Sequence, residues 1–420
     1  MKFKDVRKKG FKSFKPVNET IKLLSSHLSV MPEEKVDTID ALGRILAQNI
    51  KSPVDIPHFS RSAMDGYAVK AEDTFGASLK NPKRLKIIDK IKINEVSKTI
   101  IRDKTAIEIP TGGPIPIGAN AVIKLEDVRR DKDNLEIYFP VAPFKNVAKK
   151  GEDVVKGDII LNKGKIIRSQ EIALLLASSI LKVKVIKKPS VAIITTGSEL
   201  VKIDETPKVG QIIETNSYTI SSLCQVYGGK PVRLNIVKDN EQALMESLNN
   251  ALNYDIIAFT GGSSVGEFDL IPHVISKRND SQMLVHGIAM RPGSPTAIFM
   301  IKNKPVFCLP GFPVATMISF ETFVGYTIRK MMDANELDPR PKVKAILKRQ
   351  IPSRFGRRDY VRVKLIYDKE QGEYFAEPVR SSGSGIISSA VKADGIMEIP
   401  EDLEGYEKNS EIIVKLYLPR

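Results

Sequence analysis

Apolar residues recur at helical spacing in three stretches of the N-terminal half. Residues 17–29 (VNETIKLLSSHLS) place them three or four positions apart, which predicts an amphipathic helix. A second helix is predicted over 40–49 (DALGRILAQN), with Asp40 as its N-cap. A third is predicted over 169–178 (SQEIALLLAS), with a serine cap and Glu171 in the first turn, where a carboxylate favours the helix dipole.

Between these helices the pattern is that of strands. Residues 82–149 contain the runs LKIIDKIKI, TAIEIP, AVIKLEDV and LEIYFP, separated by Pro, Gly, Asp and Asn turns. The sequence therefore predicts an inserted β-rich domain at 54–149. It would interrupt a discontinuous framework domain of 17–53 and 150–186.

From residue 187 strands alternate with longer helices. The strand runs are VAIITT, VRLNIV, IIAF and VFCL, and the predicted helices include 217–227, 241–253 and a last one that ends near Met332. Such alternation requires right-handed crossovers and a mostly parallel sheet, so 187–334 is predicted to be an α/β domain. The clusters TGSE, TGGSS and LPGFP follow its strands directly, and the carboxyl ends of such strands form the edge where ligands bind.

The stretch 255–269 (DIIAFTGGSSVGEFD) concentrates the chemistry of this edge. Gly261, Gly262 and Ser263 offer unobstructed backbone N–H groups and a hydroxyl, a combination that binds anions. The nearby carboxylates of Glu267 and Asp269 suggest that a divalent cation accompanies a bound phosphate. The alternative is an ordinary strand, turn and helix, with Asp269 as the N-cap.

Two further polar turns lie in the β-rich domain. Ser60, Arg61, Ser62 and Asp65 crowd polar groups into a turn between two prolines and a strand, a pattern typical of functional loops. The second turn, TGGP from residue 111, equally fits a plain hairpin connection.

Composition restricts the class of protein. A chain of 420 residues with 42% hydrophobic content can form two to four packed domains. No apolar run approaches the roughly 20 residues of a membrane helix, so we expect a soluble, cytoplasmic protein without membrane association. Cys224, Cys308 and the four histidines lack the spacing of a structural zinc site or a disulfide framework.

The net charge of +15 is concentrated in two segments. Residues 1–16, a predicted basic N-terminal arm, carry seven Lys or Arg against one Asp, and residues 340–364 carry ten against one Asp. A nucleic-acid binder is one interpretation, but no helix-turn-helix, RNA-binding or zinc-finger signature accompanies the charge. We expect the second segment to face a small polyanion instead.

The ordered motifs resemble one family. SAMDGYAV, TGGPIPIGANAVI, GEDVVKGD, TTGSEL, ETNSYTI, TGGSSVGEFD, MRPGSP, LPGFPVATMISF and SSGSGIISSAVKADG are similar in order and spacing to the molybdopterin molybdenumtransferases, the MoeA proteins and the gephyrin E domain. The resemblance implies a multidomain α/β plus β fold. Its parts are a three-layer molybdopterin-binding domain, an inserted β-module, a helical and extended framework and a β-barrel-like C-terminal domain at 340–420.

The resemblance also implies the reaction. Molybdate, or alternatively tungstate, is inserted into adenylylated molybdopterin while AMP is hydrolysed off and released, with Mg²⁺ as cofactor. The implied partners are a second copy in a homodimer and, as further candidates, molybdopterin adenylyltransferase and molybdopterin-receiving enzymes. The implied catalytic residues are Asp65, Asp153, Glu199 and Asp269, of which Asp269 and Glu199 are the candidate Mg²⁺ ligands.

The implied substrate-binding residues come from every domain: Ser62, Thr111, Gly112, Asn216, Gly261, Gly262, Ser263, Arg291, Pro292, Ser294, Pro310, Gly311, Arg357, Arg358, Ser382 and Ser384. Arg291 matches the family's basic residue for the oxyanion. The segments GRRDYVRV and SSGSG match those that face the sheet domain of the partner subunit in the family.

Four positions depart from the family pattern. Ser198 replaces an Asp, Ser294 a Lys, Phe312 an Asn and Asn120 an Asp. Loss of one negative and one positive group near one rim is expected to be mutually compensating, because either loss alone leaves an unpaired charge. Because of these departures, a non-catalytic molybdopterin-binding scaffold is an alternative function. Nucleic-acid binding through the basic N-terminal arm is a second alternative.

Overall fold

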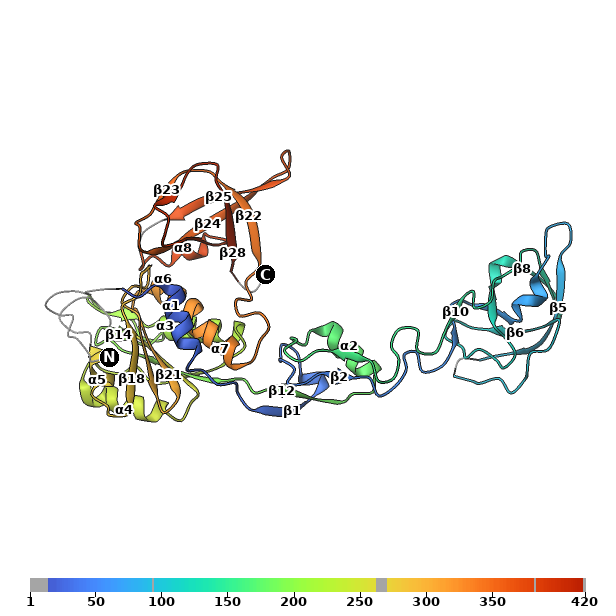
Figure 1. The fold of residues 1–420 in the computed structure, drawn as a ribbon, viewed down its shortest axis with the longest axis horizontal. Coiled ribbons are helices and arrows are strands. Elements are labelled where there is room, and N and C mark those ends of the chain that lie inside the picture. The colour runs from blue at the N-terminus through green and yellow to red at the C-terminus, as the bar shows by residue number, and fades with distance from the viewer. Residues whose placement is uncertain (1–13, 93, 262–269, 381–382, 418–420) are drawn as a thin grey trace. The chain divides into compact units, whose positions relative to one another are not determined.

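The computed structural model describes residues 14–92, 94–261, 270–380 and 383–417, and the chain folds into two compact units (Figure 1). Unit 1 comprises Met1–Glu34, Gly43–Ile45 and Ile186–Arg420. Unit 2 comprises Lys35–Leu42 and Leu46–Val185. Among the described residues no helix is long and apolar enough to cross a membrane.

Unit 1 contains the predicted α/β sheet. Its order is β16-β13-β17-β21-β20-β18, in which β16, β13, β17 and β21 are parallel and β20 is antiparallel to both of its neighbours, β21 and β18. The strands are β13 (Ser190–Thr195), β16 (Lys230–Arg233), β17 (Ile256–Thr260), β18 (Ser281–His286), β20 (Ala297–Ile301) and β21 (Lys304–Leu309). The helices are α3 (Asn216–Val226), α4 (Glu241–Ala251), α5 (Leu270–Ser276), α6 (Pro313–Ser319) and α7 (Tyr326–Met331), with a π-helical segment (Phe320–Gly325) between the last two.

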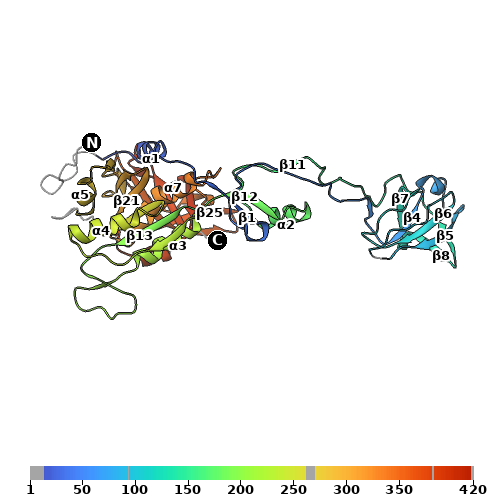
Figure 2. The same cartoon turned by 90° about the horizontal axis from the view of Figure 1, so that it is seen from below.

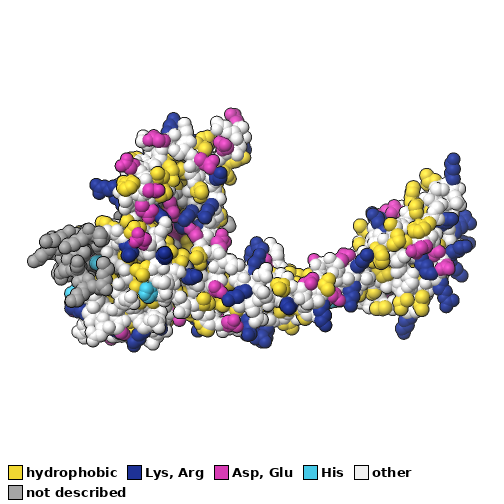
Figure 3. Space-filling view, viewed as in Figure 1, with side chains coloured by type: hydrophobic (Ala, Val, Ile, Leu, Met, Phe, Trp, Pro, Cys, Tyr) yellow, Lys and Arg dark blue, Asp and Glu magenta, His cyan; other side chains and the backbone are white. Residues whose placement is uncertain are grey.

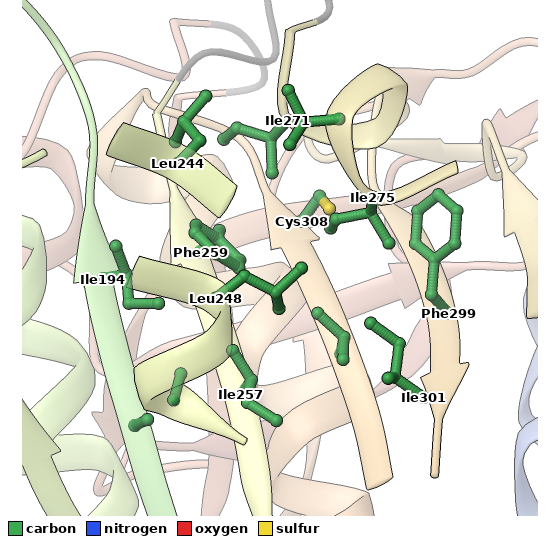
Figure 4. Close-up of a cluster of buried hydrophobic side chains, with 14 of the residues drawn as sticks. Ile194, Leu244, Leu248, Ile257, Phe259, Ile271, Ile275, Phe299, Ile301 and Cys308 are labelled. Carbon is green, nitrogen blue, oxygen red and sulfur yellow. The ribbon is translucent and has the colours of Figure 1, made fainter. Parts of the chain in front are cut away.

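Both faces of this sheet are covered, which explains the uninterrupted apolar strands. On one face α4 and α5 pack over Ile194, Phe259 and Phe299 from three strands (Figure 4). Successive strand residues point to opposite faces, so Val191 and Ile193 lie on the other face, where α3 packs. The three-layer α/β domain is therefore confirmed.

The C-terminal part of unit 1 is a closed barrel. Strands β22 (Lys342–Leu347), β24 (Arg358–Asp368), β25 (Glu373–Arg380), β26 (Gly395–Ile399) and β28 (Glu411–Leu416) pair in a ring that closes between β24 and β26. The short elements β23 (Ile351–Pro352), β27 (Gly405–Tyr406) and α8 (Ser388–Val391) complete it. The predicted barrel-like domain is confirmed. One strand of the α/β domain, β19 (Met290–Arg291), extends the barrel sheet by pairing with the start of β24.

The first predicted helix is present but shorter than expected. Helix α1 spans Val17–Ser25 and buries Val17, Thr20 and Leu24 in unit 1. Two residues before the helix, Lys15 forms backbone hydrogen bonds with Gly287 and Ala289, which fixes the start of the helix on the α/β domain.

Unit 2 contains the predicted β-module, a six-stranded sheet of order β7-β4-β6-β5-β9-β8 (Figure 2). Its strands are β4 (Gly66–Val69), β5 (Lys83–Lys90), β6 (Thr105–Ile109), β7 (Ala121–Lys124), β8 (Val128–Asp131) and β9 (Asn134–Ile137). Shorter pairs are β3 (Arg61–Ser62) with β10 (Val147–Ala148), β2 (Ile50–Lys51) with β11 (Ile159–Leu161), and β1 (Glu33–Asp37) with β12 (Lys182–Ile186). Three 3₁₀ turns lie at Thr38–Asp40, Ala71–Thr74 and Leu125–Asp127.

The helix predicted over 40–49 is wrong. A 3₁₀ turn ends at Asp40, and Gly43 then adopts a φ of +72°, which a helix does not accommodate. Beyond it Ile45 and Leu46 are extended and fully buried, and Leu46 bridges to Val185. Tertiary pairing thus overrides the local helical pattern.

The helix predicted over 169–178 is confirmed as α2 (Ser169–Ala177), but its cap is not the expected serine. Arg168 occupies the N-cap position, and Glu171 accepts hydrogen bonds from its backbone N–H (3.0 Å) and its guanidinium (2.8 and 3.1 Å). The hydrogen bond from the Arg168 side chain is the main reason that the pKa of Glu171 falls from 4.5 to about 2.

This cap predicts a pH-dependent stability. Because the folded-state pKa of Glu171 lies below its value of 4.5 in the unfolded chain, the ionised cap stabilises fully above pH 4.5 and loses its effect as the pH falls toward 2. We expect Glu171→Gln to lower the free energy of unfolding by about 1 kcal/mol at pH 7. The difference from wild type should vanish near pH 2, as measured by urea unfolding with circular dichroism.

Glu126→Gln serves as the control, since Glu126 is exposed and forms only a distant ion pair (3.8 Å) in the same unit. An equal loss in both variants, or a Glu171→Gln difference that persists at low pH, would contradict the capping role.

Candidate functional site

The carboxyl ends of three parallel strands meet at one edge of the α/β sheet. Thr195 of β13 is paired with Thr260 of β17, which is paired with Leu309 of β21. The chain leaves β13 through α3 toward β16 on one side and returns through α4 to β17 on the other. The ends of β13 and β17 therefore form the topological switch point, where a binding crevice is expected.

Side-chain hydrogen bonds fasten the loops of this edge together. Asn216, at the start of α3, donates from Nδ2 to Thr260 Oγ1 (3.0 Å) and to the Gly311 carbonyl (2.8 Å). Thr260 Oγ1 in turn donates to the Pro310 carbonyl (3.2 Å). The predicted binding residues Asn216, Pro310 and Gly311 are thus brought together, and Thr260 joins them although the sequence did not single it out.

The backbone comes unusually close at Gly261. Its φ is +109°, and a Cβ there would lie 2.0 Å from the Thr196 carbonyl oxygen, so only glycine fits. Gly311 adjoins it, with 3.3 Å between the position of a Cβ on Gly311 and the Gly261 Cα. The Thr196 hydroxyl beside Gly261 is 1% exposed and has no hydrogen-bond partner among the described residues. At this edge the backbones of two loops are in close contact, and the hydroxyls of Thr195 and Thr196 both lack a hydrogen-bond partner among the described residues.

Carboxylates flank the crevice in the TGSE loop. Glu199 is exposed, and the Ser198 backbone N–H donates to Asp239 Oδ2 (3.1 Å). Asp239 was missed by the sequence analysis, because it lies in a loop 41 residues away and only the β13–β16 pairing brings it close. An aspartate at position 198 would lie near the Asp239 carboxylate. Repulsion between the two negative charges therefore explains the serine at this position.

Gly262, Ser263, Glu267, Asp269 and Ser382 lie outside the described residues. Within the described ranges no three His, Cys, Asp or Glu side chains gather as a metal site. The described part of the edge thus offers Glu199 and Asp239 as single carboxylates. Mg²⁺ is often held by one or two carboxylates together with substrate phosphates, so these residues fit such a partial site and not an all-protein cage.

The second cluster lies where β19 pairs with β24. Arg291 is registered with Asp359, and its NH2 lies 2.7 Å from Asp359 Oδ2. Arg357 donates to the same carboxylate from Nε (2.8 Å) and NH2 (3.3 Å). Asp359 is 1% exposed, whereas the Arg291 and Arg357 side chains are 38% and 26% exposed. One buried carboxylate therefore holds two guanidinium groups whose remaining N–H groups reach solvent.

Pro292 and Ser294, both predicted to bind the substrate, contribute to the backbone structure of the loop that follows β19. The Arg291–Pro292 peptide bond is cis, and the Ser294 carbonyl accepts a hydrogen bond from the Ile288 N–H (2.9 Å). Arg358 points away from the pair: its guanidinium donates to Glu401 (2.9 and 3.2 Å), its side chain is only 14% exposed, and its charge is already balanced.

The described part of the SSGSG segment, residues 383–385, packs on the α/β domain of its own chain. The Ser384 carbonyl accepts from the Val314 N–H at the start of α6 (2.9 Å), and Gly385 lies against the Phe312 ring (3.3 Å from the position of a Cβ). The departure at position 312 thus supplies an apolar contact for a glycine. Contact of this segment with a second copy stays a prediction.

The remaining predicted residues belong to unit 2. Asp65 Oδ1 accepts from the Thr111 N–H (2.7 Å) and from the Thr111 hydroxyl (3.1 Å). Ser62 is buried and caps its own turn by donating to the Met64 carbonyl, while its backbone bonds to Gly112 and Gly113. The two polar turns of the β-module are therefore joined as one site. Asp153 is exposed, and its N–H bonds to the Ile56 carbonyl.

The last departure, Asn120, has a structural explanation. Its Oδ1 accepts from the Ala71 N–H (2.7 Å), and its Nδ2 donates to both Glu72 oxygens (3.1 and 3.2 Å). An aspartate at this position would place a carboxylate against Glu72.

Comparisons with known proteins cover nearly the whole chain. Three family models match: the MoeA N-terminal region (domain I and II) over residues 15–179, a probable molybdopterin binding domain over 192–330, and the MoeA C-terminal region (domain IV) over 344–417.

Individual relatives agree with these matches. The chain is 39% identical to the putative molybdopterin biosynthesis protein MJ0666 of Methanocaldococcus jannaschii, over 98% of this chain and 99% of that protein. It is 36% identical to a molybdopterin molybdenumtransferase of Staphylococcus aureus, over 77% of each. The crystal structure of the molybdopterin biosynthesis MoeA protein from Pyrococcus horikoshii is similar with a TM-score of 0.84 and 38% identity, covering 96% of this chain and 100% of that one. The chain therefore belongs to the MoeA family of molybdopterin molybdenumtransferases, transferases of molybdenum cofactor biosynthesis.

Proposed function

We propose that this protein inserts molybdate into adenylylated molybdopterin, with hydrolysis and release of AMP. The observation that carries the proposal is the Arg291–Asp359–Arg357 cluster, which presents two guanidinium groups of fixed orientation. Guanidinium groups bind oxyanions bidentately, and the shared carboxylate keeps the cluster from carrying its full double charge. A cluster with this reduced net charge suits molybdate, because the oxyanion must first bind and then be released to the dithiolene of molybdopterin.

The sheet edge supplies the complementary chemistry. Gly261 and Gly311 bring the backbone of two loops together at this edge, and the Thr196 hydroxyl beside them has no hydrogen-bond partner among the described residues. Glu199 would join the substrate phosphates in holding Mg²⁺, which neutralises charge during pyrophosphate cleavage. The hydroxyl and N–H groups of Thr111 hold Asp65 in one orientation, which suits a carboxylate that positions a proton or a water molecule.

The proposal extends to assembly and compartment. We propose a homodimer in the cytoplasm, where molybdopterin adenylyltransferase would supply the substrate and molybdopterin-receiving enzymes would take the product. On the one face that Figure 3 draws, Lys and Arg are interspersed with Asp and Glu on both units.

The first test is the reaction itself. Adenylylated molybdopterin, molybdate and Mg²⁺ are added to the protein, and AMP release is followed together with metal incorporation. We expect wild type to release AMP and Asp65→Asn to lower the rate by about 10²-fold, as for loss of a positioned acid–base group. Thr111→Val is the matched variant, since it removes the hydroxyl contact and leaves the backbone one. Absence of AMP release from wild type would favour the non-catalytic scaffold.

The second test addresses the guanidinium pair. Asp359→Asn removes the charge that holds Arg291 and Arg357, so we expect the KM for molybdate to rise roughly tenfold with a smaller change in kcat. Asp368→Asn, at the other end of β24, is the control of equal charge change. A lower KM in Asp359→Asn would show that net charge, and not orientation, governs oxyanion binding.

The third test concerns the two serine departures. Ser198→Asp places a carboxylate beside Asp239 and is expected to slow turnover more than Ser198→Asp combined with Ser294→Lys. Equal rates in the two variants would refute the compensation. Running the same series with tungstate in place of molybdate tests whether these positions set the choice of oxyanion.

A further inference from the structure

A hollow of about 540 Å³ opens on the barrel, apart from the residues discussed so far. It is lined by Arg349, Lys364, Glu377, Pro378, Val379 and Lys392. These residues come from the turn after β22, from β24, from β25 and from the end of α8. Its volume lies within the usual range of about 300–1,000 Å³ for small-molecule sites.

The hollow has a clear origin in the strand pairing. Parallel pairing of β22 with β25 stops at Leu347 and Ala376, while β25 continues to Arg380. Pro378 has no N–H to offer a neighbouring strand, and the β24–β25 register shifts between Arg362 and Val363, so that Val379 is left without a partner. The barrel wall therefore carries a β-bulge at this point. Bulges of this kind commonly redirect side chains at binding sites.

The charge lining the hollow is unbalanced. Arg349, Lys364 and Lys392 face one carboxylate, Glu377, and none of the three forms an ion pair in the described part of the chain. Lys364 is registered opposite Glu377 across the strands without an ion pair between them. Three unpaired cations from separate segments thus surround one cavity.

Four cations of the basic segment 340–364, Arg340, Lys344, Arg357 and Arg358, each pair with carboxylates of the described chain. Arg349 and Lys364 form no ion pair among the described residues, as is also the case for Lys342, Lys348 and Arg354, but Arg349 and Lys364 both line the hollow.

One of the three cations is fixed in place. The Arg349 NH2 donates to the Pro378 carbonyl (2.6 Å), which anchors one nitrogen of the guanidinium and leaves its other donors for a ligand. An anchored guanidinium between two flexible ammonium groups suits a phosphate, since Arg supplies directed hydrogen bonds and Lys supplies charge. Pro378 and Val379 add an apolar wall for the organic part of a ligand.

We propose that this hollow is a second anion site that binds a phosphate monoester of a small organic molecule. It is separate from the proposed insertion site, and it requires neither that reaction nor a second copy. Lys364 and Lys392 contact the phosphate, Arg349 orients it, and the Pro378–Val379 wall contacts the organic group.

Affinity labelling tests the site without any activity assay. Pyridoxal 5′-phosphate carries a phosphate and an aldehyde that condenses with a lysine Nζ to an imine with loss of water, and borohydride reduces the imine to a stable amine. Peptide mapping then locates the label. Relative to the exposed barrel lysines Lys342 and Lys369, we expect Lys364 or Lys392 to be labelled about tenfold faster. Pyridoxal, which lacks the phosphate, should show no such preference.

Arg349→Gln leaves both lysines in place and should abolish the preference for the phosphorylated reagent. Arg354→Gln removes an equal charge from the same barrel outside the hollow and should preserve it. Adenosine monophosphate should protect the labelled lysines. Equal labelling of all four lysines, equal labelling by pyridoxal, or an unchanged preference in Arg349→Gln would each overturn the proposal.

Discussion

The candidate site depends on the contact between two strand ends at Gly261. The carbonyl of Thr196 occupies the space that a side chain at residue 261 would need, so β13 and β17 stay adjacent up to their last residues. At that point their chains separate toward opposite sides of the sheet. The sheet therefore ends in a close backbone contact at its switch point, and hydrogen bonds from Asn216 and Thr260 hold the third loop against it. Any larger residue at 261 would push the strand ends apart and break this contact.

A series of ion pairs with alternating acidic and basic side chains connects the barrel to the α/β domain. Arg340 bonds to Glu321 of the π-helical segment (3.1 Å) and to Asp338, and Lys415 of the barrel bridges Asp338 (3.1 Å) and Glu398 (2.6 Å). The Arg340 and Glu321 side chains are 6% and 4% exposed. Buried pairs of this kind add little net stability, yet loss of one partner costs about 3–5 kcal/mol because a buried charge is left alone. They therefore specify one orientation of the barrel on the α/β domain, and with it the pairing of β19 and β24.

Much of the fold was predictable because it follows from periodicity. Fully apolar strands between helices predicted the parallel sheet, and glycine clusters directly after them predicted its binding edge. Prediction failed where distant partners decide: Ile45 and Leu46 lie in a helical pattern but pair with extended chain. It also failed locally at α2, where Arg168 and not the expected serine is the N-cap. Asp239 and Asp359 were missed for the first of these reasons. The contact of Asp239 with the Ser198 N–H and that of Asp359 with Arg291 both depend on segments that are distant in the sequence and that no local pattern names.

The basic segment shows why charge counting alone misleads. In GRRD, alternation along the strand start places Arg357 and Asp359 on one face and Arg358 on the other. The first two therefore meet each other and Arg291, while Arg358 meets Glu401. Two adjacent arginines of identical chemistry thus differ in function: one shares its carboxylate and stays available to an anion, and the other is taken up in holding the barrel together. The sequence shows the surplus of positive charge, but only the pairing of strands decides which cations remain to bind a ligand.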